Sequence, residues 1–217
     1  IDISKLSFDA AVLSNSQYHS RHFNNDLAGF SALLKWVKTF KELPYFCLEA
    51  TGIYGLVLAK HLHEQHQKIV VANPIQTHAF TKMEMSRNKT DKADAMSIAR
   101  YCQYLYNEGN IDKSLFIPRD ADFERVQFLV TRLDQLTKMK SQENNRLDVS
   151  LDKYAAHSVQ AMLTYIDKQI VKIKAKLAEV VRQNEQLNTQ VQLLTSIRGV
   201  GDKTAWAILA YIGDVSV

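Results

Sequence analysis

The sequence is poor in cysteine and has no long hydrophobic run. Its 217 residues include two cysteines, Cys47 and Cys102, each in an apolar segment. Isolated cysteines in such segments are ordinarily buried free thiols of a reducing compartment, so we predict no disulfide and a cytoplasmic location. No stretch of ~18 apolar residues is present, which excludes a membrane-spanning helix, and no signal peptide is visible.

The sequence also lacks a strong excess of either charge. It has 27 Lys+Arg against 23 Asp+Glu, a formal net charge of +4, which permits a nucleic-acid partner without demonstrating one. Hydrophobic residues make up 46% of the chain, enough to bury a core. The first residue is Ile rather than Met, and the sequence stops after an apparent helix, so we expect a fragment or a trimmed ordered core.

Residues 1–107 alternate between strand and helix patterns. Residues 1–23 contain three short alternating runs, IDIS, LSFDAAVLS and QYHSRHF, and an amphipathic helix with Leu27, Phe30, Leu34, Val37 and Phe40 follows. YFCLEA and KIVVANP read as buried strands, with a helix over 56–66 between them and mostly helical sequence over 75–107, broken near 86–89. The order βββ-α-β-α-β-α predicts an α/β domain over 1–118, with a mixed sheet flanked by helices.

Glycine and proline almost disappear after Pro118, where residues 120–147 and 159–194 predict long helices in an arm over 119–192. The second helix has apolar residues at alternating spacings of four and three, the coiled-coil period. This seam consists of Ile166, Ile170, Ile173, Leu177, Val180, Asn184, Leu187, Val191 and Leu194. Asn184 is its one polar member, and such a residue can fix register and oligomeric state. A shorter seam, Val126, Leu129, Leu133 and Leu136, lies in the first helix. A helical hairpin, an intermolecular coiled coil and an ordinary packed helix all remain open.

The last segment, 193–217, has the pattern of a helix-hairpin-helix motif. An apolar helix end is followed by Gly199-Val200-Gly201 and a second apolar helix. Backbone N–H groups at the start of that helix can hold a phosphate, and Arg198 and Lys203 would add positive charge. The alternative is a plain turn in which the glycines relieve backbone strain.

Four acidic residues stand where an α/β sheet would present them together. Asp2 lies between Ile1 and Ile3 on the first strand and should point away from both, and Glu49 ends a buried strand. Asp91 and Asp94 are three residues apart, so a helix would show both on one face. Phosphodiester chemistry with two metal ions ~4 Å apart needs such converging carboxylates, and oxygen ligands suit Mg²⁺. The alternative is a helix cap for Asp91 and an exposed charge for Asp94.

The basic residues, histidines and the tyrosine near these positions indicate a function less clearly than the acidic residues do. Lys82, Arg87, Lys89 and Lys92 surround Asp91 and would either neutralise phosphates or form a solvated helix face. His61, His63 and His66 have no acidic or cysteine partner at a metal-binding offset, so we expect surface histidines. We expect Tyr54, beside a glycine turn, to be a packed aromatic rather than a base-stacking one.

Several segments resemble the DEDD transposases of the insertion sequence 110 family, which includes the pilin-gene invertases. They are DISK, EATGIYG, VANP, KTDKADAMSIARY and SIRGVGDKTAWAILAYIGD, of which KTDKADAMSIARY is the most specific. The resemblance implies an RNase H-like (RuvC-like) domain in which Asp2, Glu49, Asp91 and Asp94 bind Mg²⁺, with Mn²⁺ as a substitute. It also implies DNA as substrate, a serine nucleophile beyond Val217, a guide RNA encoded by the element, and a location near a bacterial or archaeal nucleoid. The coiled-coil seam predicts a homo-oligomer, a dimer or tetramer, in which the arm joins protomers. Ser216 does not stand in the context expected of that serine.

Three other classes of protein share part of this pattern. A RuvC-type nuclease or junction resolvase would share the acidic site but use water as nucleophile. A sugar-kinase or actin-like ATPase needs glycine-rich phosphate loops, and DISKLS contains no glycine. A non-catalytic DNA-binding oligomerisation module would keep the helical arm and lose the chemistry.

Overall fold

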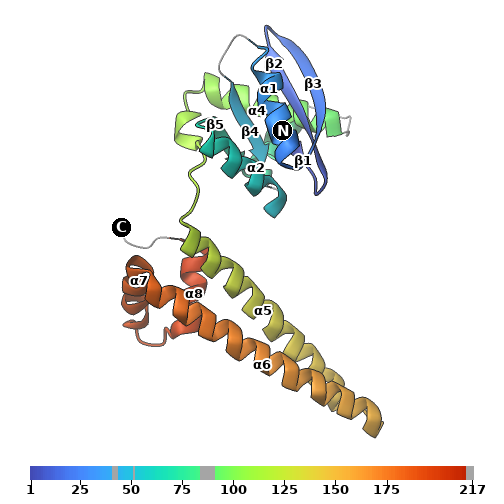
Figure 1. The fold of residues 1–217 in the computed structure, drawn as a ribbon, viewed down its shortest axis with the longest axis vertical. Helices are drawn as coiled ribbons and strands as arrows, with labels where there is room; N and C mark the ends of the chain where they lie inside the picture. The colour runs from blue at the N-terminus through green and yellow to red at the C-terminus, as the bar shows by residue number, and fades with distance from the viewer. Residues whose placement is uncertain (41–43, 51, 84–90, 214–217) are drawn as a thin grey trace. The chain divides into compact units, whose positions relative to one another are not determined.

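The computed structural model describes all residues except 41–43, 51, 84–90 and 214–217, and the side chains of Asp91 and Lys92 also lie outside the description. The chain forms two compact units, Ile1–Pro118 and Arg119–Val217 (Figure 1). The first is an α/β unit and the second is entirely helical in its described part. No helix in the described ranges combines the length and apolarity needed to cross a bilayer.

The first unit begins with an antiparallel meander. It consists of β1 (Asp2–Ile3), β2 (Ser7–Ser14) and β3 (Gln17–Asn24), as the alternating runs predict. Asn15 and Ser16 join β2 to β3 with positive φ angles of 49° and 62°, the backbone that suits a two-residue hairpin turn. β3 is an edge strand whose residues are exposed apart from Phe23.

A parallel pair of strands completes the sheet region. β4 (Tyr45–Glu49) pairs with β5 (Lys68–Ala72) across the connecting helix α2 (Ile53–Glu64). The Ile1 nitrogen donates a hydrogen bond to the Cys47 carbonyl over 2.7 Å, so β1 lies beside β4. An antiparallel sheet in the order β1-β2-β3 and a parallel pair β4-β5 therefore come together at β1 and β4, which gives the mixed arrangement that was expected.

Helices cover both faces of these strands. α1 (Leu27–Val37), capped by the Asp26 carboxylate on the Gly29 N–H, packs with α2 in a core that includes Phe46 and Leu48. α4 (Asp91–Asn107) packs against the opposite face in a core that includes Cys47. α3 (Pro74–Met83) precedes α4, and the predicted break between them lies outside the described residues. A short 3-10 turn, η1 (Asp112–Ser114), follows α4.

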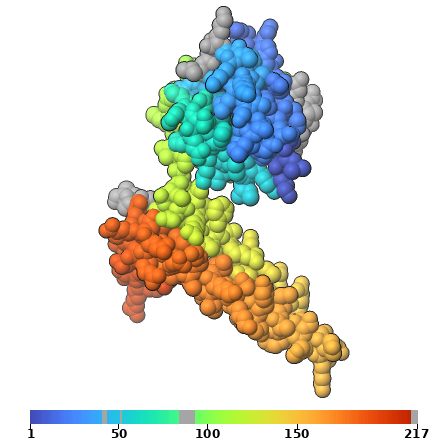
Figure 2. All heavy atoms as spheres, in the orientation of Figure 1, coloured from blue at the N-terminus to red at the C-terminus, as the bar shows by residue number. Residues whose placement is uncertain are grey.

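The second unit is a helical hairpin closed by two shorter helices. α5 (Ala121–Asp148) and α6 (Lys153–Gln183) lie against each other along the hairpin, as the atoms in Figure 2 show. α7 (Glu185–Thr195) and α8 (Asp202–Tyr211) pack on it, and one core holds side chains of all four helices. The buried seam residues of α6, including Ile166, Leu177 and Val180, therefore find apolar partners within the same chain.

The prediction of one helix over 159–194 is wrong at Asn184. α6 ends at Gln183 and α7 begins at Glu185, with Asn184 between them in extended backbone. The Asn184 Oδ1 accepts a hydrogen bond from the Leu187 N–H over 3.1 Å, so Asn184 caps α7 instead of facing a partner helix. The regular apolar spacing continues across this junction because α7 buries its own face against the same core.

Candidate metal and nucleic-acid site

Asp2 and Glu49 point to the same face of the sheet region. Side chains alternate along a strand, so Glu49 shares the face of Cys47, whose neighbours include Ile98 and Cys102 of α4. Asp2 faces away from Ile1 and Ile3, which belong to the core under α1 and α2. Both carboxylates therefore lie on the side that α4 covers, and α4 contacts β1 and β4.

A hydrogen bond from α3 holds one oxygen of Glu49. The Thr77 hydroxyl donates to Glu49 Oε2 over 3.0 Å, and Thr77 is 4% exposed. Glu49 itself is half-buried at the carboxyl end of β4. Thr77 was not recognisable from the sequence, since a threonine in a predicted helix is not distinctive.

α4 carries the other two acidic positions. Asp94 lies in the first turns of α4 and is half-buried, one residue before Ala95, which is completely buried. Asp91 begins α4, and its side chain lies outside the described residues. The structure thus brings Asp2, Glu49 and the start of α4 to one side of the sheet region, and it does not test the position of the Asp91 carboxylate.

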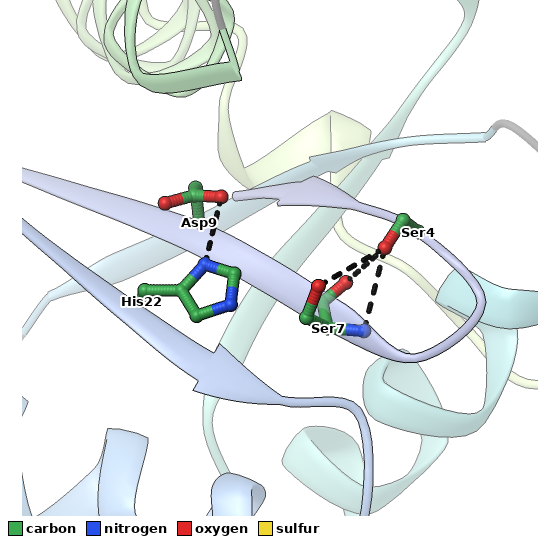
Figure 3. Close-up of polar contacts among 4 residues, drawn as sticks. All are labelled: Ser4, Ser7, Asp9 and His22. Atoms are coloured by element: carbon green, nitrogen blue, oxygen red, sulfur yellow. Dashed lines mark hydrogen bonds and ion pairs between the residues drawn. The ribbon is translucent and has the colours of Figure 1, made fainter.

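Asp9 is a further carboxylate on this face that the sequence interpretation missed. It is the register partner of Asp2, and directly opposed residues in adjacent strands share a face. Figure 3 shows the Asp9 carboxylate directed at His22 of β3, with Oδ2 3.0 Å from Nδ1. Nearby, Ser4 turns back on Ser7, its hydroxyl donating to the Ser7 carbonyl over 2.7 Å, which fixes the turn between β1 and β2. Strand register alone would have placed Asp9 beside Asp2.

The donor chemistry of this face fits a hard divalent cation. Asp2, Glu49 and Asp94 offer only carboxylate oxygens, and Mg²⁺ prefers oxygen ligands together with several waters. Within the described residues, no group of three or more His, Cys, Asp or Glu side chains is already close enough to hold a metal ion. The face therefore fits a divalent cation in the chemical type of its ligands and in the shared face of Asp2 and Glu49, and not through a preformed cluster among the described side chains.

Most of the predicted basic residues around Asp91 cannot be placed. Arg87 and Lys89 lie outside the described residues, as does the side chain of Lys92. Lys82 is exposed near the end of α3.

The residues of the predicted phosphate site in the second unit are exposed to solvent. Arg198, Gly199, Gly201 and Lys203 are all exposed at the turn from α7 to α8. Gly199 has φ +90°, and Gly201 caps α8 with no side-chain hydrogen bond. Two acidic groups oppose a phosphate there: Asp202 in the first turn of α8, and Asp134 of α5, whose Oδ1 is 3.8 Å from Lys203 Nζ.

His61 and His63 of α2 contact aromatic rings, and the two cysteines are buried. The half-buried His61 ring lies at a tilt against Phe30, with ring centroids 5.3 Å apart, and His63 meets Phe116 edge-on at 6.3 Å. His63 and His66 are exposed, as predicted for surface histidines. Cys47 and Cys102 are buried free thiols, as predicted. A hydrogen bond with Cys102, together with burial, raises the pKa of Cys47 well above its usual value, and the same bond lowers the pKa of Cys102.

A cavity of the first unit lies elsewhere. Its volume is about 470 Å³, and its walls include Val12 of β2, Val37 of α1, Phe46 of β4 and Tyr106 of α4. Asp2, Glu49 and Asp94 do not line it. The acidic face is thus distinct from this apolar cavity.

The described structure thus combines an α/β unit, with Asp2 and Glu49 on one face of its strands, and a helical unit. Comparison with known proteins identifies the family of the chain. A family model described as "Transposase", that of the DEDD transposases of insertion sequence 110, matches residues 1–156, so the chain belongs to this family.

Curated relatives agree with this assignment. The chain is 27% identical over 219 aligned residues to the pilin gene-inverting proteins of Moraxella lacunata and Moraxella bovis. The alignment covers all of this chain and 66% of each relative. The chain thus spans just under two thirds of the length of these relatives.

Proposed function

We propose that this protein is the metal-binding part of a DNA transposase or site-specific recombinase of a mobile element. The observation that carries the proposal is the shared face of Asp2 and Glu49, covered by the helix that contains Asp91 and Asp94. Membership in a transposase family and similarity to pilin gene-inverting proteins support DNA as the substrate. The mixed strands flanked by helices are consistent with an RNase H-like (RuvC-like) first unit.

In the proposed site, Asp2, Glu49, Asp91 and Asp94 hold divalent cations, Mg²⁺ or Mn²⁺. Such cations, when bound, stabilise the negative charge that develops on phosphoryl oxygens during strand cleavage. Thr77 keeps Glu49 oriented, and Asp2 is fixed by the short strand between β2 and β4. Arg87, Lys89 and Lys92 would supply the positive charge that DNA needs beside four carboxylates.

The second unit contributes contacts to the DNA backbone in this proposal. The turn from α7 to α8 resembles a helix-hairpin-helix, with Gly199 and Gly201 allowing a phosphate to approach the N–H groups of α8. Arg198 supplies positive charge to the phosphate, and Lys203 supplies more once its ion pair with Asp134 is broken. The attacking group would be a serine hydroxyl supplied by the part of the protein beyond this chain, and an element-encoded guide RNA would select the DNA target.

We also propose a homo-oligomer, a dimer or tetramer, joined through the α5–α6 arm. The apolar seam is buried within one chain, so a second copy would contact outward apolar side chains such as Phe128, Tyr165 and Val171. Light scattering of Val171→Asp against the parent protein tests this contact. A smaller assembly supports it, and an unchanged mass contradicts it.

The decisive experiment compares Asp94→Asn with Glu64→Gln, an exposed acidic position at the end of α2. In the full-length gene product, Asp94→Asn should abolish Mg²⁺-dependent DNA strand exchange and weaken Mn²⁺ binding, whereas Glu64→Gln should change neither. Metal-dependent cutting without strand exchange in the unmodified protein would favour the nuclease alternative. Unchanged activity in Asp94→Asn would remove the catalytic proposal.

A further inference from the structure

α3 contacts both β4, which carries Glu49, and α4, which carries Asp94. Thr77 lies in α3, and its hydroxyl oxygen is 3.0 Å from Glu49 Oε2 and 3.0 Å from the Pro74 carbonyl oxygen. A hydroxyl has one proton to donate, so the two acceptors compete for it. The carboxylate is the stronger acceptor, because hydrogen bonds to ionised groups are shorter and roughly twice as strong.

Burial makes this hydrogen bond consequential. Thr77 is 4% exposed, so water is largely excluded from its hydroxyl, and a lost partner would leave a desolvated polar group. The bond also restricts the side-chain torsions of Glu49, since one of the two carboxylate oxygens is held at a fixed place.

Gln76, the residue before Thr77, and Phe80 link α3 to α4. The Tyr101 hydroxyl donates to Gln76 Oε1 over 3.2 Å, and the Phe80 ring lies 5.6 Å from the Tyr101 ring and 5.3 Å from the Tyr104 ring. Tyr101 follows Asp94 by seven residues, close to two helical turns, so both lie on the same side of α4. α3 therefore contacts Glu49 through Thr77 and the Asp94 side of α4 through Gln76 and Phe80.

We propose that Thr77 is a positioning residue for the carboxylate of Glu49, and that α3 sets the separation between Glu49 and Asp94. This inference rests on the proposed function of Glu49 as a ligand of a divalent cation. Thr77 does not touch the cation itself. Its hydroxyl holds Oε2 so that the carboxylate is already oriented when the cation arrives, and groups that orient ligands in this way typically contribute 10–100-fold to metal affinity.

The test uses three substitutions in α3. Thr77→Val removes the hydroxyl and keeps the branched shape, and Thr77→Ser keeps the hydroxyl. Thr81→Val is the matched control, because the Thr81 hydroxyl donates to the Thr77 carbonyl, one turn back on α3, at 2.9 Å, and not to Glu49. Mn²⁺ affinity is measured by titration calorimetry, and folding by circular dichroism and thermal unfolding.

Thr77→Val should weaken Mn²⁺ binding about 10-fold or more, while Thr77→Ser and Thr81→Val stay within about 2-fold of the parent protein. A purely structural threonine would instead lower the Tm in Thr77→Val with no change in affinity, which would overturn the inference. Thr77→Ala repeats the comparison without the valine methyl groups where Thr77→Val fails to fold.

The outcome separates this inference from the proposal on which it rests. Normal affinity in Thr77→Val, together with lost affinity in Glu49→Gln, overturns the role of Thr77 and leaves Glu49 as a ligand. Failure of the parent protein to bind Mn²⁺ overturns the metal site itself.

Discussion

The Asn184 side-chain amide donates a hydrogen bond to Asp122 Oδ2 over 3.0 Å, which ties the junction of α6 and α7 to the first turn of α5. The same side chain caps α7 through the Leu187 N–H. One residue thus joins three helices, and its role is to turn the chain.

Asn184→Leu should destabilise the helical unit by about 1–3 kcal/mol, because both the cap and the bond to Asp122 are lost. Urea unfolding followed by circular dichroism measures the effect. Asn145→Leu, at an exposed position in α5, is the control and should change stability by less than about 0.5 kcal/mol. A more stable Asn184→Leu protein would revive the coiled-coil interpretation.

Leu177→Ala should cost about 2–5 kcal/mol, because Leu177 is 0% exposed in the core of the hairpin. Val171→Ala, 66% exposed on the same helix, should cost far less. In a Val171→Asp background, which removes the proposed contact between copies, the unfolding midpoint of Leu177→Ala should not depend on protein concentration, since this seam is buried within one chain. A strong concentration dependence would mean that the seam joins two copies.

Glu49→Gln should retain the fold and lower Mn²⁺ affinity at least about 10-fold. The amide oxygen of glutamine still accepts the Thr77 hydroxyl, but the negative charge is gone. Circular dichroism and titration calorimetry together check this result. An unfolded variant would show that Glu49 is structural.

Arg198→Ala should weaken binding to duplex DNA and reduce the slope of log K against log salt by about 1, as expected for one lost phosphate contact. Lys203→Ala should have a smaller effect, because Lys203 already lies 3.8 Å from Asp134. Fluorescence anisotropy over a salt series measures both slopes. Lys174→Ala, at an exposed position of α6, is the control. Equal slopes in all three variants would indicate a plain turn at Gly199–Gly201.

In the folded protein, iodoacetamide should modify Cys102 before Cys47. The raised pKa of Cys47 leaves less thiolate at a given pH, whereas the pKa of Cys102 is lowered. Both reactions should be slow, because both thiols are buried, and denaturant should remove the difference. Mass spectrometry of timed samples reports the order, and earlier labelling of Cys47 would contradict it.

Much of the first unit follows from local sequence patterns. Alternation predicts β1 to β3, and Phe30 and Val37 predict the buried face of an amphipathic helix, which the structure has as α1. Leu27, predicted on the same face, is exposed. Local patterns failed at Asn184 because spacings of four and three persist when a helix stops and restarts against one core.

The candidate site was only partly predictable, for a different reason. Glu49 was recognisable as a charge at the end of an apolar strand. Asp9 required the strand register, and Thr77 required the three-dimensional path of α3, neither of which a single segment contains. The sequence suggests ligands more readily than the groups that orient them.

β3 forms one margin of the sheet region, and no described strand pairs with its outer side. A strand added there would have to strip water from Arg21, His19 and His22, all exposed. Polar side chains on an edge strand discourage that pairing, so solvation of a few residues keeps this sheet from growing into an aggregate. The solubility of the first unit should therefore depend in part on the charge and hydration of β3.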